Sequence, residues 1–185
     1  FSRADLGGKQ IPALYDRVGE TRRGTVIAEG NGSVGVIEQL MAAIAGMGID
    51  DMIVAGDGPE LPILDGDALS YFVLLERAGT KEQSGLRPII RVKRTIEFTN
   101  KNAQVRLLPS DAPQYSYDLD YSNTKAIGKQ HFEMTLTRDN FARDIAPART
   151  FGFMRDIEML NKMGLGRGAS LENTLAIDGD AVVNK

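Results

Sequence analysis

The sequence has no cysteine, no tryptophan and one histidine, His131, among its 185 residues. Without cysteine, the chain has no disulfide, no thiolate metal site and no cysteine nucleophile. A single histidine cannot supply the two or three nitrogen ligands that a catalytic zinc ion usually takes from a protein. His131 alternates with Glu133 and Thr135 on the polar side of a predicted strand, so we expect it at the surface.

Long hydrophobic runs are also absent, and the net charge is −3 with lysine and arginine scattered along the chain. No run approaches the ~20 residues that cross a membrane, and no basic patch indicates nucleic-acid binding. We find no signal peptide, and we expect a cytoplasmic protein. Because the chain begins at Phe1 and stops at Lys185 within a pattern, we expect a processed or truncated piece.

A polar stretch with glycine and proline, GTKEQSGLRP, separates two periodic segments and predicts a linker. We predict a first domain at 1–80, a linker at 81–88 and a second domain at 89–185. In the first domain, apolar spacing predicts a helix over 36–47, and DDMIV predicts a strand at 51–55. A second helix is expected to follow a cap at Asp67 and to end at Gly79. Its expected buried residues are Leu69, Phe72, Val73 and Leu75.

After the linker, apolar and polar residues alternate, which is typical of strands with one buried face. In IIRVKRTIEF the residues expected on that face are Ile90, Val92, Ile96 and Phe98. NKN predicts a hairpin turn into AQVRLL, and YSYDLDY and HFEMTLT predict two more strands. Thr137 is expected to cap a helix in RDNFARDI, a last helix is expected over 153–163 with its end at Gly164, and NTLAIDGD predicts a closing strand. This mixture, without strict βαβ alternation, predicts an α+β fold with mostly antiparallel sheets.

The helix expected to open at Gly35 carries two polar residues, Glu38 and Gln39, in its first turn and away from its apolar face. An anion in that position is favoured by the helix dipole, by about 0.3–1 kcal/mol. This structural role is enough to explain Glu38 by itself. A catalytic role needs support from elsewhere in the chain.

Three segments, VIEQLMAAIAGMGIDD, DGPELPILDGDA and ARTFGFMRDIEML, together resemble the UDP-3-O-acyl-N-acetylglucosamine deacetylase family, and GRGASLENT stands where that family has its next motif. The segments keep the order and spacing of the family over nearly the whole chain. The family consists of zinc amidohydrolases of lipid A biosynthesis. The resemblance implies a duplicated fold of two domains, each a sheet with helices against it, with the active site between them. It also implies that both domains are incomplete here.

The resemblance assigns roles to six residues of this chain. Glu38 corresponds to the general base, and Thr150 to the hydroxyl donor that stabilises the tetrahedral oxyanion. The positions on the substrate side are Lys93, Asp120, Tyr121 and Phe151, and the segment near 153–176 corresponds to the insert that forms the acyl-chain passage. Thr150 could instead bond to its own backbone at a strand end. For Phe153 we prefer the simpler interpretation, an ordinary core residue.

The chain departs from the family at the metal. Gln39 stands where the family has its first zinc-ligand histidine, and an amide oxygen is a poor zinc ligand beside imidazole. Arg23 adds a charge where the family has an apolar residue near the reaction centre. The family's other two zinc ligands and its general acid would lie after Lys185, and its opening strands before Phe1. We therefore expect this chain alone to hold no zinc, to use no other cofactor and to be inactive.

Three hypotheses remain open. The chain could be a piece of a working deacetylase, a non-catalytic paralogue that binds an acylated UDP-sugar or a protein partner, or a scaffold without a ligand. We favour the second modestly over the first. Strands left without neighbours recruit other chains, so we also expect self-association.

Overall fold

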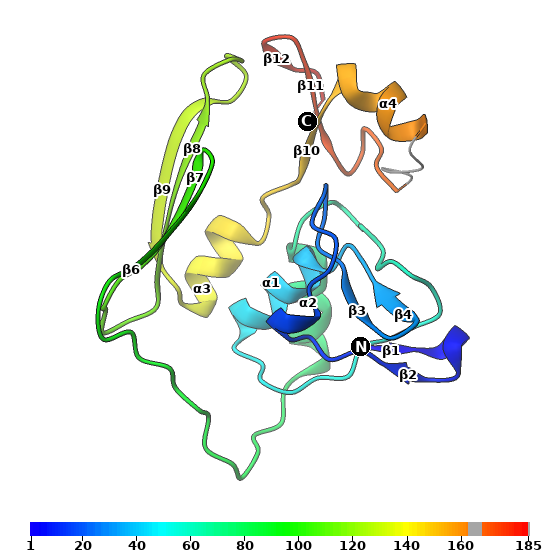
Figure 1. Ribbon diagram of the computed structural model, residues 1–185, viewed down its shortest axis with the longest axis vertical. Coiled ribbons are helices and arrows are strands. Elements are labelled where there is room, and N and C mark those ends of the chain that lie inside the picture. The colour runs from blue at the N-terminus through cyan, green and yellow to red at the C-terminus, as the bar shows by residue number, and fades with distance from the viewer. Residues whose placement is uncertain (163–167, 185) are drawn as a thin grey trace.

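The first half of the chain folds into short strands and two helices, which Figure 1 shows in blue to green. The computed structural model describes residues 1–162 and 168–184. β1 pairs with β2 in antiparallel fashion and with β5 in parallel fashion, and β3 and β4 form an antiparallel hairpin. The bounds are β1 Ser2–Arg3, β2 Lys9–Gln10, β3 Ile27–Glu29, β4 Gly32–Val34, α1 Glu38–Met47, β5 Ala55–Gly56 and α2 Leu69–Ala78.

The second half begins with two separate antiparallel hairpins and ends with a small mixed sheet. In that sheet β11 pairs with β10 in parallel fashion and with β12 in antiparallel fashion. Most strand pairs are antiparallel, so the predicted α+β class is confirmed. The bounds are β6 Ile96–Asn100, β7 Ala103–Leu107, β8 Gln114–Tyr121, β9 Gly128–Thr135, α3 Arg138–Asn140, β10 Phe151–Phe153, α4 Ile157–Lys162, β11 Leu175–Asp178 and β12 Ala181–Val182.

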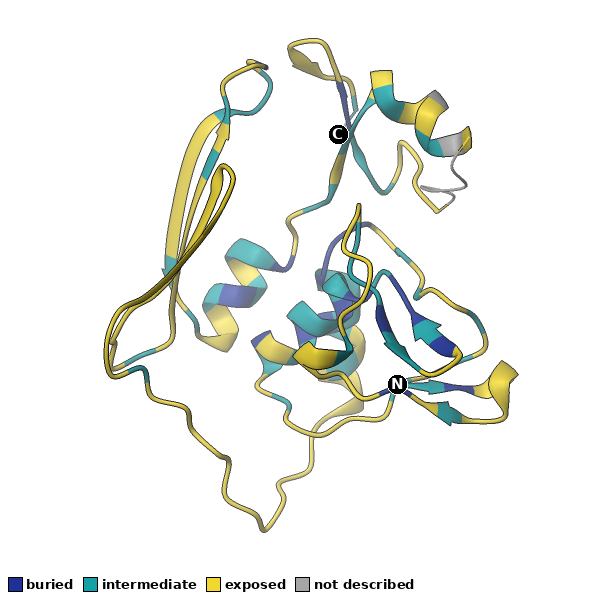
Figure 2. Ribbon diagram, in the orientation of Figure 1, coloured by how far each residue is buried: buried dark blue, intermediate teal, exposed yellow. Residues whose placement is uncertain are grey.

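Two clusters of buried side chains hold the described residues together, and they appear as dark blue segments in Figure 2. One joins both halves, because Ala43 of α1 and Phe72 of α2 pack with Phe141 and Ala146 from the turns after α3. Gly46 faces the Phe141 ring so closely that an added Cβ would lie 2.2 Å from Cδ1. The other cluster lies around β3 and β4 and consists of Ile11, Ile27, Val34 and Ile37.

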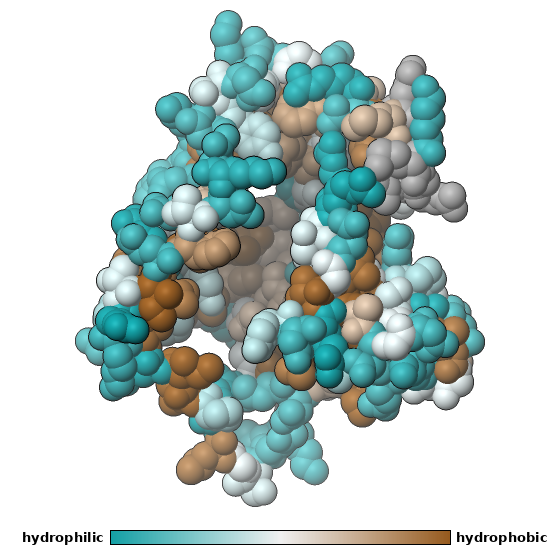
Figure 3. Space-filling model, in the orientation of Figure 1, coloured by the Kyte–Doolittle hydropathy of each residue, from teal (hydrophilic) through white to brown (hydrophobic). Residues whose placement is uncertain are grey.

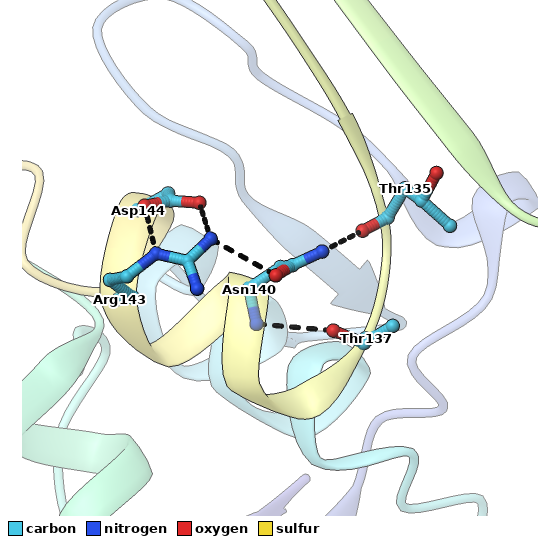
Figure 4. Close-up of polar contacts among 5 residues, drawn as sticks. All are labelled: Thr135, Thr137, Asn140, Arg143 and Asp144. Atoms are coloured by element: carbon cyan, nitrogen blue, oxygen red, sulfur yellow. Dashed lines mark hydrogen bonds and ion pairs between the residues drawn. The ribbon is translucent and has the colours of Figure 1, made fainter.

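The turn after β9 is fixed by a local network of polar contacts, which Figure 4 shows. The Thr137 hydroxyl accepts a hydrogen bond from the Asn140 N–H at 3.1 Å, which confirms the predicted cap. The Asn140 side-chain amide donates to the Thr135 carbonyl at 3.0 Å and accepts from Arg143, which also pairs with Asp144. The helix then continues as a π-helix, Phe141–Ile145, which directs Phe141 into the shared core.

The hairpins β6–β7 and β8–β9 lie largely outside the core, as their yellow colour in Figure 2 indicates. Both form where the sequence predicts strands. The expected burial of one face is wrong, however, because Ile96 is 53% exposed and Phe98 is 67% exposed. Among the residues that the structure describes, no buried cluster includes this face. Figure 3 shows hydrophobic residues at the surface on the side of the view where these hairpins lie.

Several predicted boundaries also shift. The first helix begins at Glu38, because Val36 has a left-handed φ of 56° and Gly35 is hydrogen-bonded to the segment 59–61 instead. The strand predicted at 51–55 is reduced to Ala55–Gly56, since its partner β1 has only two residues.

The strand predicted from residue 89 begins only at Ile96. Its partner strand ends at Leu107, and Pro109 soon follows without an N–H to continue the ladder. The helix predicted over 153–163 begins at Ile157, after β10 and a 3₁₀ turn, Met154–Asp156. Its predicted end at Gly164 lies outside the described residues. Within the described part of the chain, no helix is long and apolar enough to cross a membrane.

Candidate functional site

Glu38 is the first residue of α1, and its carboxylate is held from outside the helix. Glu38 Oε1 accepts a hydrogen bond from the Thr25 N–H. The described residues make no hydrogen bond to the second oxygen, Oε2. A Cβ on Gly24 would lie 3.2 Å from Oε1, so the backbone before β3 passes close to the carboxylate. The result is an oriented, half-buried carboxylate with one oxygen available as a proton acceptor.

Gln39, next to Glu38, holds its amide oxygen in the interior. Gln39 Oε1 is buried and has no hydrogen-bond partner among the described residues. In residues 1–162 and 168–184, no group of three or more His, Cys, Asp or Glu side chains could hold a metal ion. A neutral amide oxygen is a weak ligand for zinc, which prefers imidazole and thiolate. The donor set in the described part of the chain therefore does not fit a catalytic zinc ion.

Thr150 lies at the seam between the two halves, just before β10. Its N–H donates to the Gly66 carbonyl at 2.9 Å, and its carbonyl accepts from the Leu175 N–H at 2.9 Å. Gly66 has a φ of 74°, and a Cβ there would lie 1.8 Å from the Asn173 carbonyl oxygen. Only glycine fits at this position. The backbone of Thr150 is thus fixed by both halves of the chain.

Three aromatic rings gather beside Thr150. Tyr121, at the end of β8, meets Phe151 edge-on with ring centroids 5.7 Å apart, and Phe153 completes the group at 6.2 Å from Tyr121. The Arg155 guanidinium lies 4.6 Å above the Phe153 ring. Phe153 is half-buried, not a core residue, and Phe151 is 38% exposed. This aromatic cluster, Tyr121, Phe151 and Phe153, is partly exposed to solvent.

Asp120 and Lys93 are not gathered with that cluster. Because neighbouring residues of a strand face opposite sides, the Asp120 carboxylate points away from Tyr121. It pairs with Lys129 at 3.0 Å and accepts from the Ser122 N–H, and these contacts lower the pKa of Asp120 to about 2. Lys93 is exposed on the segment before β6, which has no regular structure.

His131 lies on the surface, as predicted. Its Nδ1 is 2.7 Å from an Asp118 carboxylate oxygen, and this contact raises the pKa of His131 above its ordinary value of 6.5. The side chain is half-exposed on the polar side of β9. These contacts identify His131 as part of a surface ion pair with Asp118.

Sequence patterns alone do not indicate three of these contacts. Thr25 carries no sign that its N–H holds Glu38, and nothing marks Gly66 as the partner of Thr150. The ion pair between Arg23 and Asp156, at 3.0 Å, joins residues 133 positions apart. Two positive φ angles, at Arg23 and Val36, accompany the site. They could not be inferred from residue type, because glycine or asparagine is the usual occupant of such conformations.

The comparisons with known proteins place the chain in a family. The family described as UDP-3-O-acyl N-acetylglycosamine deacetylase (LpxC) matches residues 1–185. A protein of Myxococcus xanthus with the name UDP-3-O-acyl-N-acetylglucosamine deacetylase is 39% identical over 185 residues, which are 100% of this chain and 59% of the relative. Proteins with the same name from Campylobacter fetus and Phenylobacterium zucineum are 38% and 37% identical, and the match covers 62% and 64% of their lengths. The chain thus spans about three fifths of the length of these relatives. It belongs to the UDP-3-O-acyl N-acetylglycosamine deacetylase family.

Proposed function

We propose that this chain carries the base and part of the substrate-binding surface of a deacetylase that acts on an acylated UDP-sugar, in lipid A biosynthesis as the resemblance implies. The observation that carries the proposal is the carboxylate of Glu38, which a main-chain N–H orients, while its second oxygen accepts no hydrogen bond from the residues that the structure describes. The names of the relatives support the substrate class.

In this proposal each residue has a defined task. Glu38 Oε2 takes up the proton of the attacking water, and the Thr150 hydroxyl donates to the oxygen of the amide as it gains charge. The aromatic cluster provides an apolar surface for the ligand, with Phe151 as its exposed member. A zinc ion, where members of the family bind one, would lower the pKa of that water and polarise the amide.

We further propose that the 185-residue chain binds the acylated sugar nucleotide without holding zinc. The support is the donor set: Gln39 contributes a neutral amide oxygen, and the described residues form no three-residue metal cluster. Binding without hydrolysis is the behaviour that separates a non-catalytic paralogue from a working enzyme. The two are distinguished by whether bound ligand is recovered intact.

Titration calorimetry with UDP-3-O-acyl-N-acetylglucosamine tests the binding. Each buried CH₂ of the acyl chain should add about 0.8 kcal/mol, or roughly fourfold in affinity. Phe151→Ala should weaken binding roughly two- to thirteenfold, as expected for loss of an aromatic contact of about 0.5–1.5 kcal/mol. Phe98→Ala is the matched control, because Phe98 is an exposed aromatic residue on the β6–β7 hairpin, outside the aromatic cluster. Absence of heat, or an equal loss in both variants, would refute the binding surface.

A further inference from the structure

The loop before β3 is fixed at its tip by one ion pair that comes from the other half of the chain. Arg23 Nη2 donates to Asp156 Oδ2 at 3.0 Å, in the 3₁₀ turn that follows β10. Two residues later, the Thr25 N–H donates to Glu38. Figure 1 shows this loop extending toward β10. The Arg23 guanidinium is therefore linked to the N–H that holds the Glu38 carboxylate through only three residues of backbone, 23–25.

Backbone hydrogen bonds within the loop hold its base together, but they do not reach its tip. Gly19 N–H donates to the Val26 carbonyl at 2.8 Å, and Val26 N–H donates to the Glu20 carbonyl at 2.9 Å. Between these bonds, residues 22–24 form bends without a regular hydrogen-bond ladder. Among the residues that the structure describes, the tip is held from elsewhere in the chain by the Arg23–Asp156 contact and the Thr25–Glu38 contact.

Arg23 has an unusual backbone conformation and a partly shielded side chain. Its φ is 64°, in the left-handed region that a non-glycine residue adopts at a cost. The side chain of Arg23 is 45% exposed and that of Asp156 is 23% exposed, so the pair is partly shielded from water. The other carboxylate oxygen of Asp156, Oδ1, lies 3.9 Å from Arg155 Nε. The Arg155 guanidinium in turn lies over the Phe153 ring. The ion pair thus connects the loop to the aromatic cluster.

We propose that Arg23 is a positioning residue, which orients the Glu38 carboxylate by holding the 21–25 loop against Asp156. This inference rests on the proposed role of Glu38 as base. The loop presents the Thr25 N–H at one carboxylate oxygen, so the other oxygen faces a fixed direction. When the ion pair is removed, Thr25 and Glu38 separate more often and the carboxylate loses its orientation.

The amide proton of Thr25 reports on this bond in the ligand-free protein by NMR. Arg23→Ala and Asp156→Ala should each shift it upfield and speed its hydrogen exchange roughly two- to fivefold, as expected for a partly exposed ion pair. The exchanged pair, Arg23→Asp with Asp156→Arg, should restore much of the original shift. Arg22→Ala, at the neighbouring exposed arginine, should leave the signal unchanged. Glu38→Gln should move it directly, which verifies that the signal reports on Glu38.

A purely structural role predicts a different pattern. Arg23→Gly relieves the left-handed φ, so it should not lower the stability of the fold, yet it should release the Thr25 proton as Arg23→Ala does. An unchanged Thr25 signal in both Arg23 variants would overturn the proposal. The proposal would also fail if the charge exchange did not restore the Thr25 signal while core amides such as that of Ile27 kept their positions. Because these spectra need no ligand, they fail or succeed independently of the calorimetric test of substrate binding.

Discussion

Replacing Gly46 with alanine tests the contact that joins the two halves of the chain. Gly46 lies inside α1 and is buried against the ring of Phe141, which belongs to the π-helix after α3. Helix propensity alone predicts that the change stabilises the protein by about 1 kcal/mol. The close packing of the Phe141 ring against Gly46 predicts instead that the change destabilises the protein.

The size of the packing effect follows from the distances. A Cβ at position 46 would lie 2.2 Å, 2.4 Å and 2.6 Å from three atoms of the Phe141 ring, where contacts below 3.0 Å do not occur. The ring must therefore move by about 1 Å or leave its place against Phe72, whose centroid is 5.8 Å away. Overpacking costs typically about 1–3 kcal/mol, and loss of a buried Phe about 3–5 kcal/mol. After subtraction of the propensity gain, we expect a net loss of about 2 kcal/mol.

Urea unfolding followed by circular dichroism measures this change. Ala45→Gly is the matched control, because Ala45 is an exposed neighbour on the same helix and should show only the propensity effect, about 1 kcal/mol. In a Phe141→Leu background, Gly46→Ala should cost less, since the two sites share one contact. If Gly46→Ala unfolds at the same or a higher urea concentration than the original chain, the close packing of α1 on Phe141 is wrong.

Three further predictions concern the metal, association and pH. After dialysis against zinc, both the original 185-residue chain and Gln39→His should contain far less than one zinc per chain by elemental analysis, and neither should hydrolyse the amide; stoichiometric zinc, or turnover abolished by Glu38→Ala, would contradict this. The exposed apolar face of β6 and β7 should cause self-association, which Phe98→Lys should reduce in sedimentation velocity; a clean monomer of the unchanged chain at high concentration would refute it. The raised pKa of His131 means that its protonated pair with Asp118 stabilises the β8–β9 hairpin below pH 6.5, and that this contribution disappears as pH rises through the raised pKa; the NMR titration midpoint of His131 should fall in Asp118→Asn, and an unchanged midpoint would exclude the pair as its cause.

Local patterns in the sequence are enough to predict elements whose contacts are near in the chain. The alternation in YSYDLDY and HFEMTLT gave β8 and β9, because side chains of a strand alternate between faces. The cap at Thr137 was predictable because its hydroxyl reaches an N–H only three residues away. The end of α2 before Gly79 follows from the same short-range logic.

The face that a strand buries could not be predicted in this way. Ile96 and Phe98 alternate with polar residues as a buried face would, yet both are more than half exposed. Alternation shows which side chains share a face, but burial depends on whether another element covers it. The separation of the domains at 81–88 likewise stays a prediction.

Residue order is enough to predict the α+β class, the hairpins, the position of Glu38 in the first turn of a helix and the family resemblance. Those properties depend on residue type and short spacing. Three sets of contacts are visible only in the folded chain: the Thr25 N–H holds Glu38, Gly66 and Leu175 fix Thr150, and Arg23 meets Asp156. Such contacts join segments that come together only when the buried clusters form, so their geometry depends on how the loops pack and not on any local pattern.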